Sequence, residues 1–294
     1  RIESSAASDV YKRQGKGVVQ IKVMGGPEAI KMFEQPNAVR DGVVDMVHTP
    51  GSFYGAAVPE IDAMVASTKN ATEARANGGT AMMDAAHQKR FNVKYLAWID
   101  SGVGFNIFTV NEPKFRSSDG VLDMSGVKMR DNPIYTAFLK SLEATTSPMP
   151  STEVYGALEK GVIDAAPWTT IGITDLKWNK FLNYMVEPSF YSTDLGIIVN
   201  LDRWNGLSAE AKAILQDVAI EWEQKSHNDR KADISKYKAA YKEGGMDFVS
   251  HSDSGGANYL KLAYDSVWAR ATERMTDKGD GGDVAKLRAL YAPE

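Results

Sequence analysis

The sequence contains no cysteine among its 294 residues. This excludes disulfides, zinc–thiolate sites, iron–sulfur clusters and cysteine nucleophiles together, and it is compatible with an oxidising compartment. A basic excess is also missing, because 34 Lys and Arg oppose 38 Asp and Glu for a formal net charge of −4. We therefore expect no nucleic-acid partner. No apolar, uncharged stretch reaches the length of about 18 residues that suggests a membrane-spanning helix, so none is expected.

Motifs of familiar catalytic chemistry are missing as well. The segment Gly51–Gly55 is not a GxSxG nucleophile elbow, and Gly102–Gly104 lacks the third glycine of a dinucleotide-binding loop. The acidic stretch Asp277–Asp283 lacks the ligand order and the final Glu of an EF-hand. The four histidines do not have the spacing of metal ligands; they are His48, His87, His227 and His251. We expect no metal and no cofactor, and nothing in the sequence indicates an enzyme.

Residues 1–14 mix Ser, Ala and charged residues without a helical or strand period, and position 1 is not Met. The part from Ser5 to Gln14 resembles translated cloning or adaptor sequence. We interpret residues 1–14 as a non-native tail, with a genuine disordered tail as the alternative. If the tail is non-native, a signal peptide and the first strand and helix of the domain would be missing.

Predicted helices and strands alternate along the rest of the chain, which favours an α/β fold with mainly parallel sheets. Apolar alternation and β-branched runs predict strands at residues 19–23, 43–47, 95–99, 105–110, 126–130, 162–166 and 195–201. Helical segments are expected from Pro27 onward and at residues 37–40, 71–92, 133–142 and 153–160.

A single long helix is predicted from Ser208 to about Glu243. Ser208 suits the N-cap, apolar residues recur at helical spacing, and Gly244 supplies the stop. Such a helix would be roughly 50 Å long and would span both lobes of a two-lobed molecule. Two helices broken near His227–Asp229 are the alternative.

An internal repeat supports two similar lobes. Residues 38–45 (AVRDGVVD) and 157–164 (ALEKGVID) share a helix end, a glycine, a β-branched pair and an Asp. We interpret them as equivalent helix–strand units of two α/β lobes, with chance similarity as the alternative. Ligands of open α/β sheets bind outside the carboxyl ends of strands, so two facing lobes would form a cleft.

The side chain with the clearest binding chemistry is Arg130, at the end of the predicted strand 126–130. Its planar fork can hold a carboxylate by two parallel hydrogen bonds, whereas an internal salt bridge is the plain alternative. Aromatic and amide residues occupy comparable positions at strand ends and suit a small-molecule cleft, although core packing explains each aromatic equally well. They are Tyr54, Phe105, Asn106, Trp168 and Asn200.

At these residues the chain resembles the DctP family, the periplasmic solute-binding proteins of tripartite ATP-independent periplasmic (TRAP) transporters. The resemblance extends from about residue 15 to 294. It is carried by residues 25–29 (GGPEA), 42–46 (GVVDM), 126–130 (GVKMR), 153–164 (EVYGALEKGVID) and 199–205 (VNLDRWN).

The resemblance implies a two-lobed periplasmic-binding-protein-like fold, with a cleft between the lobes and a long helix across both. Lobe I would comprise residues 15–106 and 206–244, and lobe II residues 107–205 and 245–294. Arg130 would hold the ligand carboxylate, Trp168 would occupy a pocket position, and Phe105 and Asn106 would lie nearby. Glu28 and Tyr155, in the matching stretches, complete the candidate ligand-binding residues.

Two departures from the family pattern bear on the ligand. Phe105 and Asn106 occupy the region where some members carry a second pocket arginine, which argues against a sialic-acid-like ligand. Trp168 replaces a polar residue of some relatives and favours a flatter or more apolar acid, such as an aromatic or 2-oxo acid.

We therefore expect a periplasmic binding protein that captures a small organic-acid anion and delivers it to the membrane subunits of a TRAP permease. Two alternatives remain open from the residues alone. One is a ligand-binding module of a sensor, and the other is a small-molecule enzyme on a similar two-lobed scaffold.

Overall fold

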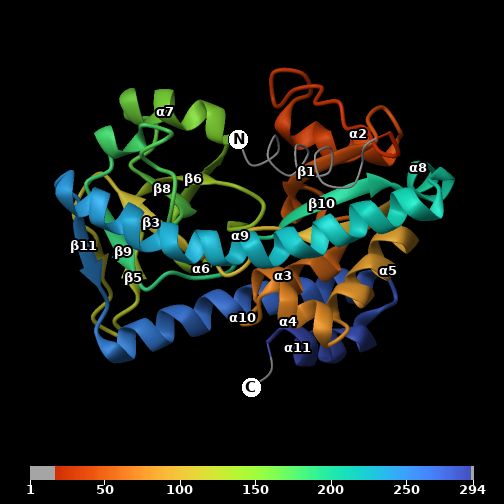
Figure 1. Cartoon of the computed structure of the whole chain (residues 1–294). Helices are drawn as coiled ribbons and strands as arrows, with labels where there is room; N and C mark the ends of the chain where they lie inside the picture. Colours follow the sequence, from red (N-terminus) through yellow and green to blue (C-terminus); the bar gives the residue numbers. More distant parts are fainter. Residues whose placement is uncertain (1–16, 293–294) are drawn as a thin grey trace.

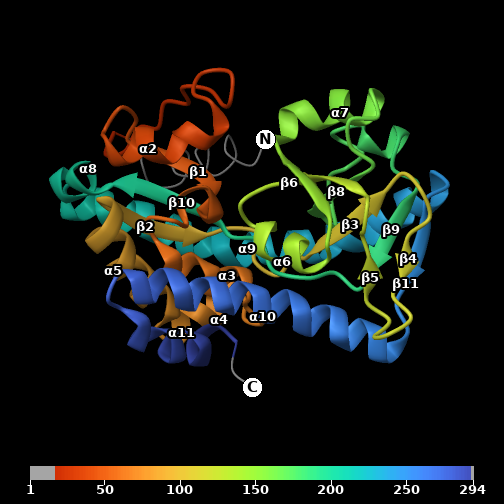
Figure 2. The ribbon, with the colours of Figure 1, turned by 180° about the vertical axis from the view of Figure 1, so that it is seen from behind.

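The computed structural model of the chain describes residues 17–292, so the predicted tail at residues 1–14 lies outside the described residues. Two halves, each built on its own β-sheet, lie side by side, and two long helices run across both of them (Figure 1). The view from behind shows the same division (Figure 2). This is the mixed α/β, two-lobed architecture that the sequence predicts.

The first half is built on a sheet of three strands in the order β1-β10-β2, and β10 runs antiparallel to both neighbours. The strands are β1 (Met46–Pro50), β2 (Val93–Trp98) and β10 (Leu195–Asn200). The helices of this half are α2 (Gln35–Arg40), α3 (Asp62–Val65), α4 (Ala71–Ala76), α5 (Gly79–Phe91), α8 (Leu201–Gly206) and α11 (Val284–Tyr291). Short 3-10 helices at Met32–Glu34, Gly51–Tyr54, Pro59–Ile61 and Gly281–Asp283 connect them.

The second half is built on a six-stranded sheet in the order β11-β9-β3-β8-β6-β7. Its strands are β3 (Phe105–Thr109), β6 (Lys128–Asp131), β7 (Thr145–Pro148), β8 (Ala165–Thr169), β9 (Tyr184–Glu187) and β11 (Asp247–Ser250). A small hairpin, β4 (Lys114–Phe115) and β5 (Leu122–Asp123), lies beside it. The helical segments are α6 (Thr136–Ser141), α7 (Ser151–Glu159) and a 3-10 helix at Trp178–Lys180.

Both sheets are mixed or antiparallel, so the prediction of mainly parallel sheets is wrong. The strand β3 runs against β8 and β9, and β10 runs against β1 and β2. Each of them follows a non-helical connection between the halves, residues 99–104 before β3 and residues 188–194 before β10, and these two connections are called the crossings below. The local helix–strand alternation predicts the parallel set β6, β7 and β8, but it carries no information on a strand that enters a sheet from the other half.

The long helix is confirmed as one element, α9 (Ala209–Glu243) of 35 residues, and the alternative of a break near His227 is wrong. Its N-cap is Ser208, whose hydroxyl accepts a hydrogen bond from the Ala211 amide at 3.1 Å. At 1.5 Å per residue the helix is about 52 Å long. A second long helix, α10 (Asp253–Asp277), was not predicted; it crosses both halves on the side that Figure 2 shows in front.

The internal repeat appears as two identical helix ends. After α2 the amides of Gly42 and Val43 donate to the carbonyls of Val39 and Ala38 at 3.1 and 2.8 Å. After α7 the amides of Gly161 and Val162 make the matching bonds to Leu158 and Ala157, also at 3.1 and 2.8 Å. This is the Schellman arrangement, and both glycines have positive φ, 72° and 64°.

The same caps explain why two strands begin later than predicted. The predicted strands 43–47 and 162–166 start instead at Met46 and Ala165, directly after the Asp of each repeat. Val43 and Val162 serve in the helix caps and stay exposed, at 72% and 51%. Their β-branched side chains suggested a strand, but backbone bonding assigned them to the helix ends.

Three further expectations are corrected. Residues 19–23 form no strand; Val19 and Ile21 pack on a cluster that includes Trp204, and this packing accounts for their alternation. The chain after Pro27 forms turns before the short helix at Met32. The predicted helix 71–92 is divided into α4 and α5 because Gly78 adopts a positive φ of 93°.

The predicted lobe ranges stay a prediction, although two segments pack differently from them. The strand β10 falls in the range predicted for lobe II, yet it lies in the sheet of the first half. The helix α11 also falls in that range, and it contacts α3 and α5 of the first half. Before each of these segments the chain passes from the second half back to the first, and no local sequence pattern predicts that passage.

Candidate functional site

The site begins with two residues near the carboxyl ends of neighbouring strands. Arg130 is the penultimate residue of β6 and Trp168 that of β8, and the two strands are parallel neighbours. Carboxyl ends of parallel strands meet at one edge of a sheet. The guanidinium carbon of Arg130 consequently lies 5.4 Å from the ring centre of Trp168.

The guanidinium of Arg130 is buried and held by backbone oxygens. The side chain is 1% exposed. Its Nε donates to the carbonyl of Met149 at 3.3 Å, and its Nη1 donates to the carbonyl of Pro167 at 3.2 Å. The aromatic ring of Tyr135 lies 5.7 Å from the guanidinium carbon and its hydroxyl interacts with the guanidinium. These contacts fix the plane of the fork without neutralising its charge.

Within residues 17–292 no carboxylate lies within ion-pair distance, 4.0 Å, of Arg130. The adjacent Asp131 turns to its own loop, where its carboxylate accepts from the Asn132 amide at 2.7 Å and from the Thr136 hydroxyl at 3.0 Å. Burial lowers the pKa of Arg130 and raises the pKa of the Tyr135 hydroxyl. Burying a charge is costly, so an anion beside Arg130 would offset that cost.

Phe105 belongs to the same aromatic group, and Asn106 stands opposite Trp168 in the β3–β8 pair with its polar atoms already bonded. The ring of Phe105 packs edge-on against Tyr135 with ring centres 5.2 Å apart. Asn106 is fully buried on β3, donates from Nδ2 to the Val186 carbonyl at 2.8 Å and accepts from the Thr170 hydroxyl at 2.7 Å. Its polar atoms are used inside the second half, which favours a structural role over ligand contact.

The other four candidate residues lie apart from Arg130. Tyr54 is a core residue whose hydroxyl bonds His87 at 3.1 Å, and Tyr155 on α7 packs edge-on against Phe181. Glu28 accepts from the Gly26 amide at 2.7 Å in an exposed turn, and that bond lowers the pKa of the carboxyl.

Asn200 is the N-cap of α8 and bonds three backbone groups. Its Oδ1 accepts from the Arg203 amide at 3.0 Å, and its Nδ2 donates to the carbonyls of Val39 and Arg40 at 2.9 and 3.1 Å. It therefore joins α8 to the end of α2. The structure thus brings Arg130, Trp168 and Phe105 together and places Asn106 beside Trp168 with its polar atoms used internally. It distributes the other four candidate residues over the molecule.

Tyr135 is the site residue that the sequence analysis missed. It stands five positions after Arg130, and the turn in which its amide bonds the Asn132 carbonyl at 2.8 Å brings the ring back to the arginine. The one signal in the sequence is an aromatic residue just after the segment Asp131–Pro133, which breaks the strand and starts α6.

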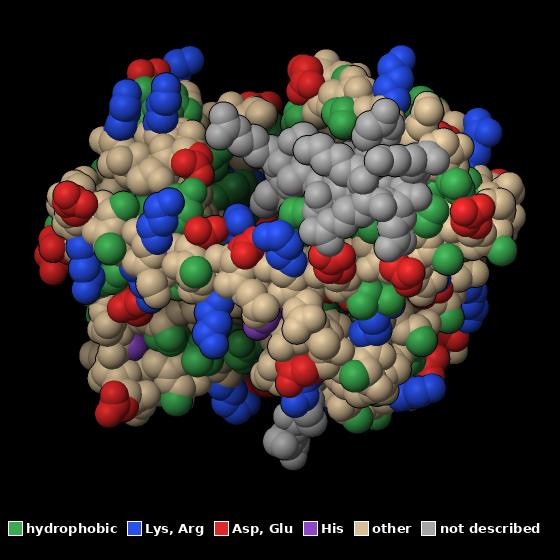
Figure 3. All heavy atoms as spheres, in the orientation of Figure 1, with side chains coloured by type: hydrophobic (Ala, Val, Ile, Leu, Met, Phe, Trp, Pro, Cys, Tyr) green, Lys and Arg blue, Asp and Glu red, His purple; other side chains and the backbone are tan. Residues whose placement is uncertain are grey.

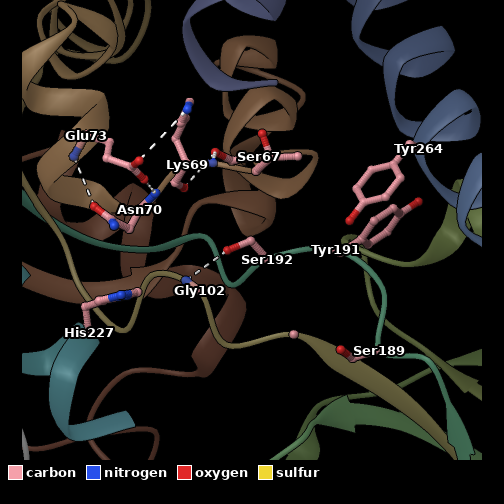
Figure 4. Close-up of a pocket in the computed structure, with 12 residues that line it drawn as sticks. Ser67, Lys69, Asn70, Glu73, Gly102, Ser189, Tyr191, Ser192, His227 and Tyr264 are labelled. Carbon is pink, nitrogen blue, oxygen red and sulfur yellow. Dashed lines mark hydrogen bonds and ion pairs between the residues drawn. The ribbon is translucent and has the colours of Figure 1, made fainter. Parts of the chain in front are cut away.

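Two hollows are visible between the halves. The space-filling view shows one on the upper side, next to the atoms drawn in grey (Figure 3). A second, polar cavity of about 300 Å³ lies at the two crossings of the chain (Figure 4). Its lining includes Gly102, Gly104, Ser189, His227 of α9 and Tyr264 of α10. Residues of both crossings and both long helices line it, so a rotation of one half against the other must change its shape.

Neither a metal centre nor a membrane-crossing helix is found in the described part of the chain. No group of three or more His, Cys, Asp or Glu side chains there is arranged to hold a metal ion. Among the same residues no helix is both long and apolar enough to pass through a bilayer.

Comparison with known proteins gives one family throughout. A solute-binding protein of Albidiferax ferrireducens is 25% identical over 313 residues, which cover 99% of this chain and 84% of that protein. A monocarboxylate 2-oxoacid-binding periplasmic protein of Nostoc sp. is 27% identical over 230 residues, 73% of this chain and 61% of that protein.

The same fold occurs in a solved structure, a TRAP solute-binding protein of an unidentified marine microbe. That protein is specific for aromatic acids and contains 3-hydroxybenzoate. It is 22% identical, with a TM-score of 0.79 over 98% of this chain and 91% of that one. The expected fold is thereby confirmed.

The model of bacterial extracellular solute-binding proteins, family 7, named DctP, matches residues 7–273. Proteins of this family bind solutes for TRAP transporters and are not enzymes, so the enzyme alternative is set aside. The protein belongs to the DctP family of bacterial extracellular solute-binding proteins.

Proposed function

We propose that the protein captures a small organic-acid anion between its two halves, with Arg130 as the carboxylate ligand, and delivers it to a TRAP membrane permease. The observation that carries this proposal is the buried guanidinium of Arg130, which has two carbonyl partners and no carboxylate partner among residues 17–292. A ligand carboxylate would supply the missing counter-charge in a region of low dielectric, where an ion pair is strong.

The hydrogen-bond inventory of Arg130 supports a two-point grip on the ligand. A guanidinium has five N–H groups, and the two bonds to carbonyls use one on Nε and one on Nη1. The second Nη1–H and the two on Nη2 are left for the Tyr135 hydroxyl and for a carboxylate. A carboxylate that meets Nη1 and Nη2 end-on forms two parallel charge-assisted bonds.

The side chains around Arg130 favour a flat ligand. Trp168 and Phe105 bring aromatic surfaces to the arginine, directly and through Tyr135. Aromatic walls with a few polar groups select planar, partly apolar molecules. We therefore propose a 2-oxo or aromatic monocarboxylate, the classes named for the Nostoc relative and for the marine solute-binding protein.

Delivery to a permease and a periplasmic location follow from family membership in this proposal. Ligand binding would bring the halves together by a hinge motion at the two crossings and bury the ion pair. Uptake of the labelled acid into vesicles that contain the partner permease should depend on addition of this protein.

Isothermal titration with a 2-oxo acid, 3-hydroxybenzoate and malonate tests the site. The protein should bind at least one of them in a 1:1 ratio, and the acid should be recovered unchanged. Arg130→Ala should weaken binding about 100-fold, because it removes one partner of a buried charge pair. Arg130→Lys should weaken it about 10-fold, because a lysine loses the fork but keeps the charge.

The matched control is Arg116→Ala. Arg116 pairs with Asp119 at 2.9 Å in the loop of the β4–β5 hairpin, so its loss removes an arginine without touching the site. Binding by this variant should stay within about twofold of the unmodified protein. Equal affinity of Arg130→Ala and the unmodified protein for the bound acid would refute the role of Arg130.

A further inference from the structure

Arg270 of α10 makes a buried double contact that joins the two halves. Its side chain is 10% exposed. Nε and Nη2 donate to the two carboxylate oxygens of Asp62 at 2.9 and 2.6 Å. Nη1 points to the other half and donates to the carbonyl of Pro133 at 2.9 Å. One planar group therefore bonds in two directions at once.

The two partners of Arg270 belong to different halves of the molecule. Asp62 is the first residue of α3, which packs with α10 and α11 beside the three-stranded sheet. Pro133 lies in the loop between β6 and α6 of the six-stranded sheet. The rigid fork of an arginine can serve both, whereas the single ammonium of a lysine cannot reproduce this geometry.

The loop that Arg270 holds is the loop that carries the carboxylate site. It starts directly after Arg130 and ends at Tyr135. Inside it, the Asn132 amide donates to the Asp131 carboxylate at 2.7 Å and the Tyr135 amide donates to the Asn132 carbonyl at 2.8 Å. Because these bonds make the loop a unit, a shift of the Pro133 carbonyl moves Tyr135 relative to Arg130.

We propose that Arg270 is a positioning residue for the carboxylate site: it ties the loop Asp131–Tyr135 to α3 of the first half and so fixes Tyr135 beside Arg130. This inference rests on the proposed function for its consequence in binding, but the position of the loop can be measured without a ligand.

The test variant is Arg270→Lys, which keeps a positive charge for Asp62 and loses the donor to Pro133. The control is Arg274→Lys, one turn further along α10, because Arg274 also faces Asp62, at 3.7 Å, and makes no recorded bond to the loop within the described residues. Both variants retain a cation beside the buried carboxylate. Arg274→Lys thus controls for a changed cation near Asp62, whereas loss of the two-point contact with Asp62 is specific to Arg270→Lys. The further variant Asp62→Asn weakens that contact but keeps the Arg270 donor to Pro133, and residues 131–142 should exchange at the normal rate in it.

Amide hydrogen exchange of the ligand-free protein gives the direct readout. In Arg270→Lys we expect peptides covering residues 131–142 to exchange about 10-fold faster, with residues 151–159 of α7 unchanged. In Arg274→Lys the rates should match those of the unmodified protein. Unchanged exchange of residues 131–142 in Arg270→Lys would overturn the inference.

If Arg270→Lys does not fold, the pair Asp62→Asn/Arg270→Gln removes both charges together and allows the same exchange measurement.

Stopped-flow binding of the acid found by titration then gives the functional consequence. Arg270→Lys should raise the dissociation rate about 10-fold and leave the association rate within about twofold, because the site forms but is held less firmly.

The outcomes separate the two proposals. Failure of the unmodified protein to bind any organic acid would overturn the proposed function, while hydrogen exchange still decides the role of Arg270 in placing the loop. Faster exchange with unchanged dissociation of a bound acid would show that the loop position does not serve binding, which also contradicts the inference.

Discussion

Three half-buried arginines of the described chain have an acid partner, and the fully buried Arg130 does not. Arg75 pairs with Glu223, Arg90 with Glu60 and Arg270 with Asp62, each with nitrogen–oxygen distances of 2.6 to 2.9 Å. Arg130 meets carbonyl groups, aromatic rings and the Tyr135 hydroxyl, but no carboxylate within 4.0 Å among residues 17–292. The protein thus supplies a counter-charge to these three arginines, and the contrast with Arg130 supports its proposed role as a carboxylate ligand.

The candidate residues show which part of a site a sequence can reveal. That Arg130 and Trp168 lie together could be predicted because strand ends of parallel neighbours meet, a relation that holds within one lobe. Asn106 and Asn200 could not be classified, because their partners, Val186 and Val39, lie 80 and 161 positions away in the chain. A polar residue near a strand end has the same sequence signature whether it bonds a ligand or a distant carbonyl.

Asn200 is expected to matter for stability and not for binding. Asn200→Ala removes the N-cap of α8 and the two bonds that hold the end of α2. Together these losses should lower the free energy of unfolding by about 2–3 kcal/mol. Urea unfolding measures the loss, and titration of the acid should give an unchanged affinity; a change of more than fivefold in that affinity would restore Asn200 to the ligand site.

His87 should make the protein less stable as the pH falls from neutral. It is fully buried; its Nδ1 donates to the Met83 carbonyl at 2.7 Å, and its Nε2 accepts from the Tyr54 hydroxyl at 3.1 Å, which requires the neutral ring. Burial lowers its pKa from 6.5 to about 4. The unfolded chain therefore takes up a proton below pH 6.5 that the folded chain refuses down to about pH 4.

The stabilisation that His87 gives is present above pH 6.5 and is lost as the pH falls toward 4. Between neutral pH and pH 5, protonation linked to His87 should lower the free energy of unfolding by about 2 kcal/mol. His87→Gln should show a shallower fall of the free energy of unfolding over this range, measured by urea titration at several pH values. Identical pH slopes for the two proteins would contradict this account. His48, whose pKa desolvation also lowers to about 4, contributes equally in both proteins.

At the scale of elements, local bonding decided where helices end and strands begin. Periodicity and capping residues predicted α9 correctly over its whole length, because every signal for it is local. The strands β1 and β8 were placed three residues too early, since β-branched valines occupy the two Schellman caps. The helix α10 was missed because Gly255 and Gly256 weaken the helical pattern near its start.

Gly156 inside α7 and Gly161 just after its end should respond in opposite ways to the same substitution. Gly156 is inside the helix with open space where a Cβ would be, so Gly156→Ala should stabilise the protein by about 0.5–1 kcal/mol. Gly161 also has open space but a φ of 64°, so Gly161→Ala should destabilise it by about 1 kcal/mol. Thermal unfolding measures both variants. Equal shifts of the unfolding temperature in the same direction would contradict the role of Gly161 in the helix cap.

At the scale of the whole molecule, the two crossings set how the halves meet. The first crossing runs through Gly104 and the second through Ser189, and both line the cavity of Figure 4. A Cβ at Gly104 would lie 2.8 Å from both Cβ and Oγ of Ser189. The glycine thus permits a close approach of the two connections at the place where a hinge must act.

Gly104→Ala should force the crossings apart by a few tenths of an ångström and alter the angle between the halves. Since Arg130 lies in the second half and its proposed ligand must also meet the first, the variant should bind the acid about 10-fold more weakly. The site residues themselves remain unchanged. Because the halves would meet at a different angle, small-angle scattering of the ligand-bound form should show a wider molecule. A normal affinity would mean that the crossings do not control the cleft.

The partner substitution Ser189→Gly relieves the clash, because it removes both atoms that the new Cβ would contact. The next atom, the carbonyl oxygen of Phe190, is 3.6 Å away, an ordinary contact. The double variant Gly104→Ala/Ser189→Gly should therefore recover most of the lost affinity, whereas Ser189→Gly alone should have little effect. If the double variant binds as weakly as Gly104→Ala, the loss comes from backbone stiffness at residue 104 and not from the approach of the two connections.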